Sequence, residues 1–477
     1  MAFSAAAAPA QIMTDLLPRL YPIARSITGN GVRTSLQLLQ EVAPLQLVEV
    51  PSGTQVFDWI VPDEWNVADA YIANAVGDRV VDFSSHSLHL VSYSTPIHAH
   101  MSLAELRPHL HTLPEQPDAI PYRTSYYRPD WGFCLSQRQL DAFTDGQYEV
   151  CVDSTLAPGS LTYGELVLGG ELEDEVLIST HICHPSLAND NLSGMLLAAC
   201  LARELARRPR RYTYRFLFIP GTIGSITWLA LHMEQAQRIQ HGLVVACVGD
   251  RGPLHYKRTR RGDAEIDRVV ACVLAESGEP YTLLDFSPYG YDERQYCSPG
   301  FDLAVGSLTR TPHGRYPQYH TSDDNLDLVR PETIDASLGT YLRVIEVLEQ
   351  NRTFRSTNPM CEPQLGRRGL YGSLGGRSDT KAVEMAMLWV LNQADGSHTL
   401  LDIKERSGMR FAELQEAAAL LQQHDLLLEA APSDAARLPR TFSGTPSEAS
   451  RYAGSKELMG RAHRLIPGGA ADGEEEE

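Results

Sequence analysis

Apolar runs and segments of helical periodicity alternate from about residue 146 to residue 352, and this alternation restricts the fold most strongly. Short aliphatic and β-branched runs are typical of buried strands, whereas apolar residues spaced three or four apart are typical of helices. We expect strands at residues 164–169, 175–180, 213–219, 242–249, 281–286 and 303–308. We expect helices at residues 192–207, 224–234, 262–276 and 331–350. This order of elements predicts an α/β domain in which helices cover a sheet.

One of the expected strands ends in a group of residue types that bind metals. The strand at 175–180 leads into a loop that holds His181, Cys183, His184 and Asp190, and a helix follows. Open α/β sheets bind ligands at the carboxyl ends of their strands. Zinc prefers imidazole, thiolate and carboxylate ligands, and a catalytic zinc leaves one position to water. We therefore predict a metal centre with His181 and Asp190 as ligands. His184 is a ligand, a group that orients a ligand, or a substrate contact.

Two further segments bring candidate ligands to the same edge of the sheet. His320 follows a long loop and precedes a helix. Alone it would be interpreted as an exposed loop histidine, but together with the first group it is a predicted ligand. Asp250 ends the apolar run at 242–249 and is either a further ligand or a cap of the turn at Gly252.

The loop at 290–297 places polar residues between two apolar runs. Arg294 is a candidate for binding a substrate carboxylate, because its planar guanidinium offers two parallel donors. Asp292 is a candidate for holding another part of the substrate, and Tyr319, beside the predicted ligand His320, is a further candidate contact. The alternative is a salt-bridged surface loop.

The chain has room for about two or three domains. We expect a discontinuous catalytic domain (13–45 and 131–355), an inserted β-rich lid (46–130) and a winged-helix-like module (363–431) after a glycine-rich linker. Residues 1–12 and 432–477 are expected to be disordered. The insertion carries an aromatic cluster that lines a substrate cleft or packs a small core of its own: Tyr122, Tyr126, Tyr127 and Trp131.

Composition limits the partners. The net charge of -19 argues against binding of nucleic acid through a broad basic surface. The C-terminal module could also make the protein a DNA-binding regulator. However, the expected recognition segment of the module, at 410–416, has more acidic than basic residues. No segment resembles a signal peptide or a membrane span, and none of the cysteines forms a CxxC pair. We expect a cytoplasmic protein with neither a membrane nor a nucleic-acid partner, whose module packs on the catalytic domain or mediates self-association.

Several of these stretches resemble a known family. Residues 181–194 are similar to the metal loop of zinc-dependent aminopeptidases, and residues 319–324 resemble their last histidine segment. Residues 20–29 and 369–372 match a narrower bacterial group, the aminopeptidase-like domain proteins, which carry an inserted β domain and a C-terminal winged helix. The resemblance implies a phosphorylase/hydrolase-like core, a mixed sheet flanked by helices, with one or two zinc ions. It assigns as ligands His181, Asp190, His320 and, less securely, Asp250.

The implied reaction is attack of a metal-activated water on an amide of a small peptide or aminoacyl substrate. The chain departs from the pattern at Gly221, where the narrower group usually has a glutamate that binds metal or acts as general base. It also has Cys183 where the aminopeptidases have a ligand-orienting aspartate. Cys183 or Glu293 would then serve in the reaction, or Gly221 is an inactivating substitution. Alternatively, the protein has lost hydrolysis and is a metal-binding scaffold or an amide-processing biosynthetic enzyme.

Overall fold

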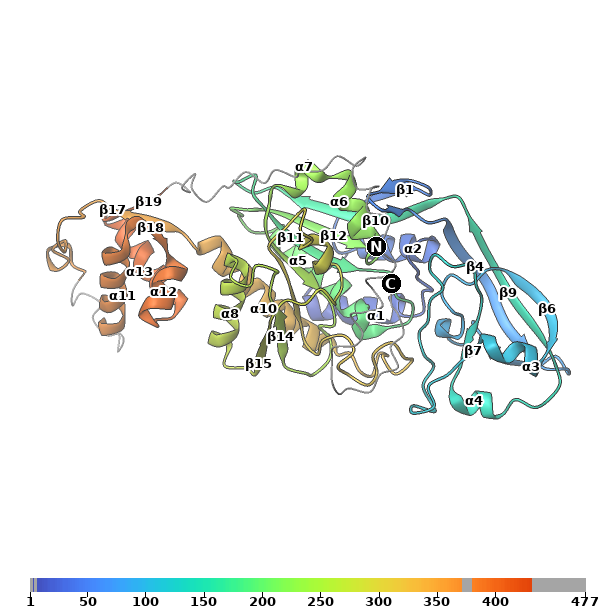
Figure 1. Cartoon of the computed structure of the whole chain (residues 1–477). Coiled ribbons are helices and arrows are strands. Elements are labelled where there is room, and N and C mark those ends of the chain that lie inside the picture. The colour runs from blue at the N-terminus through green and yellow to red at the C-terminus, as the bar shows by residue number, and fades with distance from the viewer. Residues whose placement is uncertain (1–2, 4–6, 371–379, 431–477) are drawn as a thin grey trace, which may run out of the picture.

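The computed structural model describes residue 3 and residues 7–370 and 380–430. Figure 1 shows three parts in a row: the C-terminal module, a central sheet covered by helices, and a smaller β domain. Residues 432–477, which we expected to be disordered, lie outside the described residues. In the described part of the chain, no helix has the length and hydropathy needed to cross a membrane.

The central part is built on an eight-stranded sheet with the order β1-β10-β12-β11-β13-β16-β14-β15. β11 pairs in parallel with β12 and β13, and β13 pairs in parallel with β16. β10 is antiparallel to β1 and β12, and β14 is antiparallel to β16, so the predicted mixed sheet is confirmed. The strands are β1 (Gln46–Pro51), β10 (Ser160–Leu168), β11 (Glu175–His181), β12 (Thr213–Ile219), β13 (Ile239–Val245), β14 (Leu254–Lys257), β15 (Tyr281–Leu284) and β16 (Val305–Thr309).

Helices cover both faces of this sheet. Along β11, Val176 and Ile178 belong to one apolar core and Leu177 to the other, because side chains alternate between the faces of a strand. The second core is closed by α6 (Ile223–Leu231) and by the inserted domain. The helices over the first core are α1 (Pro9–Leu20), α2 (Asn30–Leu39), α5 (Gly194–Leu205), α8 (Glu265–Ser277) and α10 (Pro331–Gln350). Burial on both faces explains why β11 is an unbroken apolar run.

The inserted domain has a four-stranded sheet with the order β5-β4-β9-β6. Its strands are β4 (Glu64–Ala73), β5 (Arg79–Asp82), β6 (Ile97–Ser102) and β9 (Gln147–Ala157). The predicted limits of 46 and 130 are therefore wrong. β1 pairs with β10 of the central sheet, and β9 pairs with β4 and β6 of the insertion.

Other differences from the expected elements are local. Residues 9–12 belong to α1 rather than to a disordered terminus. β14 was not predicted. β17 (Thr353–Ser356), expected to be linker, lies between β18 (Asp395–Thr399) and β19 (Leu427–Glu429) in the sheet of the C-terminal module. The module's helices are α11 (Thr380–Gln393), α12 (Leu400–Ser407) and α13 (Phe411–Gln423), and α13 contains most of the expected recognition segment at 410–416.

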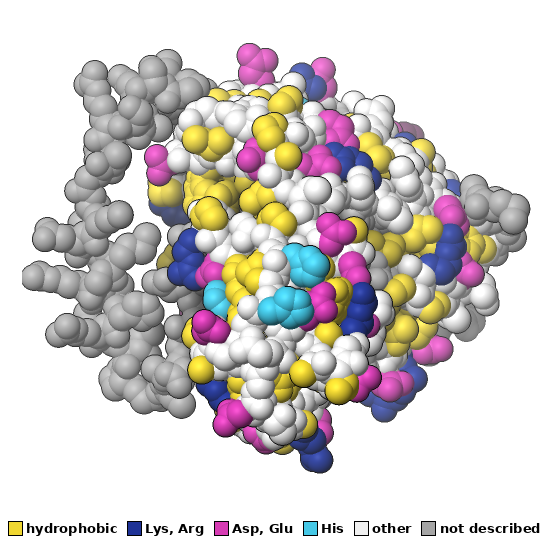
Figure 2. All heavy atoms as spheres, turned by 90° about the vertical axis from the view of Figure 1, so that its right-hand side faces the viewer, with side chains coloured by type: hydrophobic (Ala, Val, Ile, Leu, Met, Phe, Trp, Pro, Cys, Tyr) yellow, Lys and Arg dark blue, Asp and Glu magenta, His cyan; other side chains and the backbone are white. Residues whose placement is uncertain are grey.

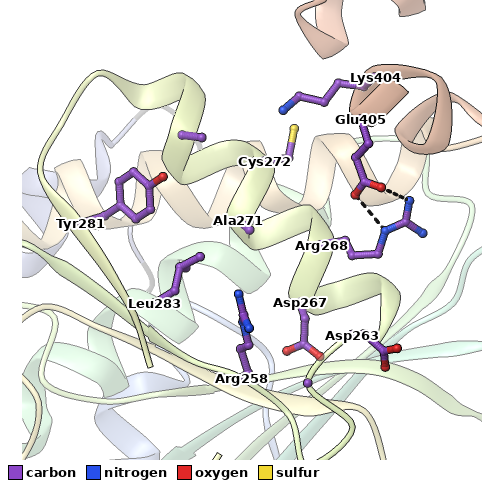
Figure 3. A pocket seen from close by; sticks show the side chains of 12 residues that line it. Arg258, Asp263, Asp267, Arg268, Ala271, Cys272, Tyr281, Leu283, Lys404 and Glu405 are labelled. Atoms are coloured by element: carbon purple, nitrogen blue, oxygen red, sulfur yellow. Dashed lines mark hydrogen bonds and ion pairs between the residues drawn. The ribbon is translucent and has the colours of Figure 1, made fainter. Parts of the chain in front are cut away.

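The C-terminal module packs against α8 of the central part. The guanidinium of Arg268 lies 2.6 Å from a carboxylate oxygen of Asp402 and 2.7 Å from one of Glu405, as Figure 3 shows for the second pair. The backbone N–H of Phe411, which begins α13, donates to Glu276 at 3.1 Å. The start of the expected recognition helix therefore faces an acidic side chain of α8 rather than open solvent.

Candidate metal centre

The candidate centre is arranged around the carboxylate of Asp190. Its Oδ1 lies 2.7 Å from Nε2 of His181, and its Oδ2 lies 3.1 Å from Nε2 of His320. Nε2 of His184 is 4.0 Å from the same Oδ2. His181 ends β11, and the loop after β11 supplies His184 and Asp190, whereas His320 comes from the loop between β16 and α10. The structure thus brings these four sequence-predicted residues together at the carboxyl edge of the sheet.

Burial and charge set the protonation of this group. Burial acts to raise the pKa of the Asp190 carboxyl, but the histidines around it outweigh that effect and hold its pKa well below the usual range. Burial lowers the pKa of His184 well below its usual value, and His181 and His320 add to this, although Asp190 opposes it. Asp190 is therefore a carboxylate and His184 a neutral imidazole at pH 7, and these are the forms that bind metals.

Asp324 fixes the loop that carries Asp190. Its carboxylate accepts the backbone N–H groups of Asn189 at 2.5 Å and of Asp190 at 3.0 Å, and the Tyr316 hydroxyl at 3.2 Å. Burial raises the pKa of Asp324 to about 7. Its position within the 319–324 segment was the only signal of this role in the sequence.

Asp250 does not join the cluster, which corrects its assignment as a ligand. One oxygen accepts the Gly252 N–H at 2.6 Å and the Thr311 hydroxyl at 2.7 Å, and the other accepts the Asn189 amide at 3.1 Å. Asp250 therefore caps the turn, which was the alternative interpretation. Through its hydrogen bond with Asn189, Asp250 also holds the loop that carries Asp190.

Arg25, which lies in the 20–29 segment, holds the backbone of the loop that carries His184. Its Nε donates to the carbonyl of His184 at 2.8 Å, and its Nη1 donates to the carbonyl of Leu20 at 2.7 Å. The side chain is fully buried, and burial lowers its pKa to about 10. Sequence reasoning missed this role, because the two ends of the contact are far apart in the chain.

Tyr291 fills the space next to Gly221. A Cβ atom built at Gly221 would lie 2.1 Å from Cε1 of Tyr291 and 2.7 Å from its hydroxyl oxygen. The Tyr291 ring centroid is 4.0 Å from that of His181, and its hydroxyl is 3.3 Å from Sγ of Cys183. A phenol thus stands where a side chain at position 221 would begin, and the sequence analysis did not anticipate it.

Neither tentative catalytic residue suits that role. Burial raises the pKa of the Cys183 thiol to about 12, so almost no thiolate is present at pH 7. The Glu293 carboxylate is buried, lies 2.8 Å from Nζ of Lys257, and accepts the backbone N–H of Tyr291. Glu293 is therefore a structural ion-pair partner, and Cys183 is a packed thiol beside the centre.

Asp292 is not exposed to substrate either, which corrects its assignment as a substrate contact. The side chain is fully buried, and its Oδ1 accepts the Ser225 hydroxyl at 2.8 Å. Its Oδ2 is buried without a hydrogen-bond partner. Burial raises the pKa of Asp292 to about 7, although the charge of His181 opposes the shift.

A cleft opens beside the centre. His184 and His320 line it, together with Arg294 and five tyrosines: Tyr122, Tyr126, Tyr289, Tyr291 and Tyr319. Arg294 and Tyr319, the two remaining candidate substrate contacts, thus both line this cleft.

The inserted domain forms part of the cleft wall. The Tyr122 ring centroid lies 5.1 Å from those of His184 and His320, and the Tyr122 N–H donates to the His320 carbonyl at 2.8 Å. The aromatic cluster of the insertion was expected either to line a substrate cleft or to pack a small core, and its members do both. Tyr122 and Tyr126 line the cleft, whereas Trp131 stacks on His109 with ring centroids 3.8 Å apart. On the face of this domain, Figure 2 shows basic side chains scattered among acidic ones rather than gathered in a patch.

A model of a protein family, described as a domain of unknown function (DUF4910), matches residues 14–351. The chain belongs to the DUF4910 family. A winged helix-turn-helix model matches residues 352–429, so the predicted winged helix is confirmed.

Relatives of this DUF4910 chain connect it with aminopeptidases. A Clostridium acetobutylicum protein, named for polysaccharide biosynthesis and an aminopeptidase-like domain, is 51% identical over 413 residues, covering 87% of this chain and 95% of that protein. The crystal structure of a peptidase candidate from Clostridium acetobutylicum matches with a TM-score of 0.84 and 49% identity, over 88% of this chain and 96% of the other. The resemblance to aminopeptidase-like domain proteins is confirmed.

A zinc aminopeptidase from Bacillus subtilis, BSAP, shares the fold at a TM-score of 0.53 and 13% identity, over 71% of this chain and 94% of that protein.

Proposed function

We propose that this DUF4910 protein is a zinc-dependent hydrolase that cleaves an amide bond of a small substrate. The observation that carries the proposal is the convergence of His181 and His320 on the two oxygens of Asp190, beside an open cleft. The zinc aminopeptidase fold supports it.

The donor set fits zinc. Two imidazoles and one carboxylate, with a fourth position left open, form the type of shell found in catalytic zinc sites. His181, Asp190 and His320 would hold the ion. His184 adjoins them, since the ligand atoms of His181, His184 and Asp190 all lie within 4.8 Å of one another. We propose a single ion, because Asp250 is engaged in its turn and no longer available for a second. When bound, zinc supplies an activated water and polarises the amide carbonyl.

The chain's own residues provide positioning and proton transfer. His184 lines the cleft as a neutral imidazole, and Nε2, the nitrogen turned toward Asp190, is its candidate site for taking up a proton. Tyr122 and Tyr126 narrow the cleft from the inserted domain, so a small substrate enters whereas a folded protein is kept out. The name of the Clostridium relative supports an amide-bearing intermediate of polysaccharide biosynthesis as the substrate.

A second candidate is a non-hydrolytic member that keeps the metal centre. The observation that favours it is the pairing of Gly221 with Tyr291, which leaves no room for the expected glutamate. Under this proposal the protein binds metal and an amide-bearing ligand without cleaving it, or joins an amide in a biosynthetic pathway.

The test is elemental analysis of the purified chain and of His320→Ala, followed by hydrolysis assays on small amides. About one zinc per chain, lost in the variant, together with amide cleavage supports the hydrolase. Zinc without cleavage supports the second candidate. A folded wild-type chain without bound metal refutes both.

We also propose that the protein acts in the cytoplasm. All eight cysteines are free thiols, which suits a reducing compartment. Neither nucleic acid nor membrane is part of the proposal, and self-association through the winged-helix module remains a prediction.

A further inference from the structure

Arg294 has no ion-pair partner among the described residues of the cleft. Its Nε is buried without a hydrogen-bond partner, and within the described residues no carboxylate lies within ion-pair distance of its guanidinium. Of the two acids beside it in sequence, Glu293 pairs with Lys257, and Asp292 accepts the Ser225 hydroxyl. Burial raises the pKa of Asp292, and the charge of Arg294 acts to lower it, without an ion pair or hydrogen bond between the two side chains. Nε itself is out of reach of a ligand, but the side chain is only partly buried and lines the cleft, so its charge is open to a ligand that supplies an acceptor.

The wall of the cleft lacks carboxylates that could pair with a substrate ammonium group. Among its described lining residues, none is an aspartate or a glutamate. The polar groups are the phenols of residues such as Tyr126 and Tyr289 and the imidazoles of residues such as His184, together with the guanidinium of Arg294. An aminopeptidase substrate brings a free ammonium group, which needs a carboxylate partner when water is removed. This cleft provides none, and a bound zinc ion would add further positive charge.

We infer that the substrate presents a carboxylate to Arg294 and reaches the metal centre with an acylated rather than a free amine. The inference rests on the proposed function and names its substrate class: an N-acyl amino acid or a similar acid with an amide close to its carboxylate. Arg294 and His320 line the same cleft, so a single small molecule can contact both. A guanidinium recognises a planar carboxylate through two parallel hydrogen bonds.

The test is calorimetric binding to the purified full-length chain, with and without prior chelation. Four related small ligands differ in charge and in the group that carries it: N-acetylalanine has a carboxylate, alanine amide has an ammonium, N-acetylalanine amide has neither, and O-phospho-N-acetylserine amide has a phosphate. We expect N-acetylalanine to bind about tenfold or more tightly than the next ligand, the range for hydrogen bonds to a charged group.

Variants test whether Arg294 causes this preference. Arg294→Gln should remove the tenfold preference, and Arg294→Lys should keep part of it. Arg138→Gln is the control, because it removes the same charge from an exposed ion pair with Asp118 in the inserted domain. Thermal unfolding of each variant verifies that it is folded.

The outcomes separate this inference from the proposed function. A preference for N-acetylalanine that depends on Arg294 but persists in chelated or metal-free protein supports the inference even where the hydrolase proposal fails. Equal binding of all ligands, tighter binding of alanine amide or of the phosphate, absence of N-acetylalanine binding at millimolar concentration, or an unchanged preference in Arg294→Gln overturns it.

Discussion

Replacing Gly221 by glutamate tests whether Tyr291 has taken over the space of the expected side chain. In the structure, a Cβ at position 221 would lie 2.1 Å from Cε1 of Tyr291, far inside van der Waals contact. Tyr291 must therefore move, and it gives up its 3.3 Å contact with Cys183. Overpacking costs about 1–3 kcal/mol, and the lost hydrogen bond adds about 0.5–1.5 kcal/mol. We expect Gly221→Glu to lower the free energy of unfolding by about 2–4 kcal/mol.

The companion substitution Tyr291→Ala makes room for the new side chain. Alone it leaves a cavity and should cost about 1–3 kcal/mol, below the range for a fully buried ring, because Tyr291 is only partly buried. In the double variant the glutamate enters that cavity, so the combined cost should be smaller than the two single costs together by at least about 1 kcal/mol. We expect amide hydrolysis to appear or increase in the double variant rather than in Gly221→Glu alone.

The free energy of unfolding of the two single variants and of the double variant is measured by urea unfolding, which tryptophan fluorescence monitors. Gly300→Glu is the matched control, because a Cβ at Gly300 has no neighbour within 4 Å, and it should change stability little. The reasoning is refuted if the effects of Gly221→Glu and Tyr291→Ala add within about 0.5 kcal/mol.

Two further predictions concern the titratable groups. His184→Ala should keep the zinc seen by elemental analysis and lower kcat by about 10²–10⁴, the usual worth of a proton-transfer group, whereas loss of zinc would make His184 a ligand. Asp292→Asn should flatten the pH dependence of stability. Since the pKa of Asp292 is raised from 3.8 to about 7, the folded state holds a proton that the unfolded state loses, and stability falls as pH rises from about 4 to 7. At pH 8 the variant should gain stability on the order of 2–4 kcal/mol by urea unfolding, and an unchanged pH profile would contradict the assignment.

The inner strands of the central sheet, such as β11 and β12, were predictable because burial on both faces makes them nearly unbroken apolar runs. β14 escaped prediction because it is short and carries the polar residues His255 and Lys257. The limits of the insertion could not be predicted from local pattern. β1 and β9 have similar strand character, and only their partners, which are distant in sequence, decide to which sheet they belong.

The same distinction separates the predicted from the missed residues of the site. His181 and Asp190 come from one short segment at a strand end, so their chemistry and position were visible together. The contacts of Arg25 with His184, and of Tyr291 with the space at Gly221, join segments far apart in the chain. Asp250 shows the converse, since residue type and position suggested a ligand while its hydrogen bonds make it a cap.

The glycine at position 221 and the charge of Arg294 both favour an acidic substrate over one with a free ammonium group. A glutamate at position 221, which the family resemblance leads one to expect, would place a carboxylate in the wall of the cleft, since Gly221 lines it. Without that glutamate, the site lacks this general base. It also lacks a carboxylate that could pair with Arg294 or with a substrate ammonium group. Under both proposals, the loss of the base and the preference for an acid would follow from this one difference. The Gly221→Glu, Tyr291→Ala double variant should accordingly bind N-acetylalanine more weakly than the wild-type chain, even though it regains the base.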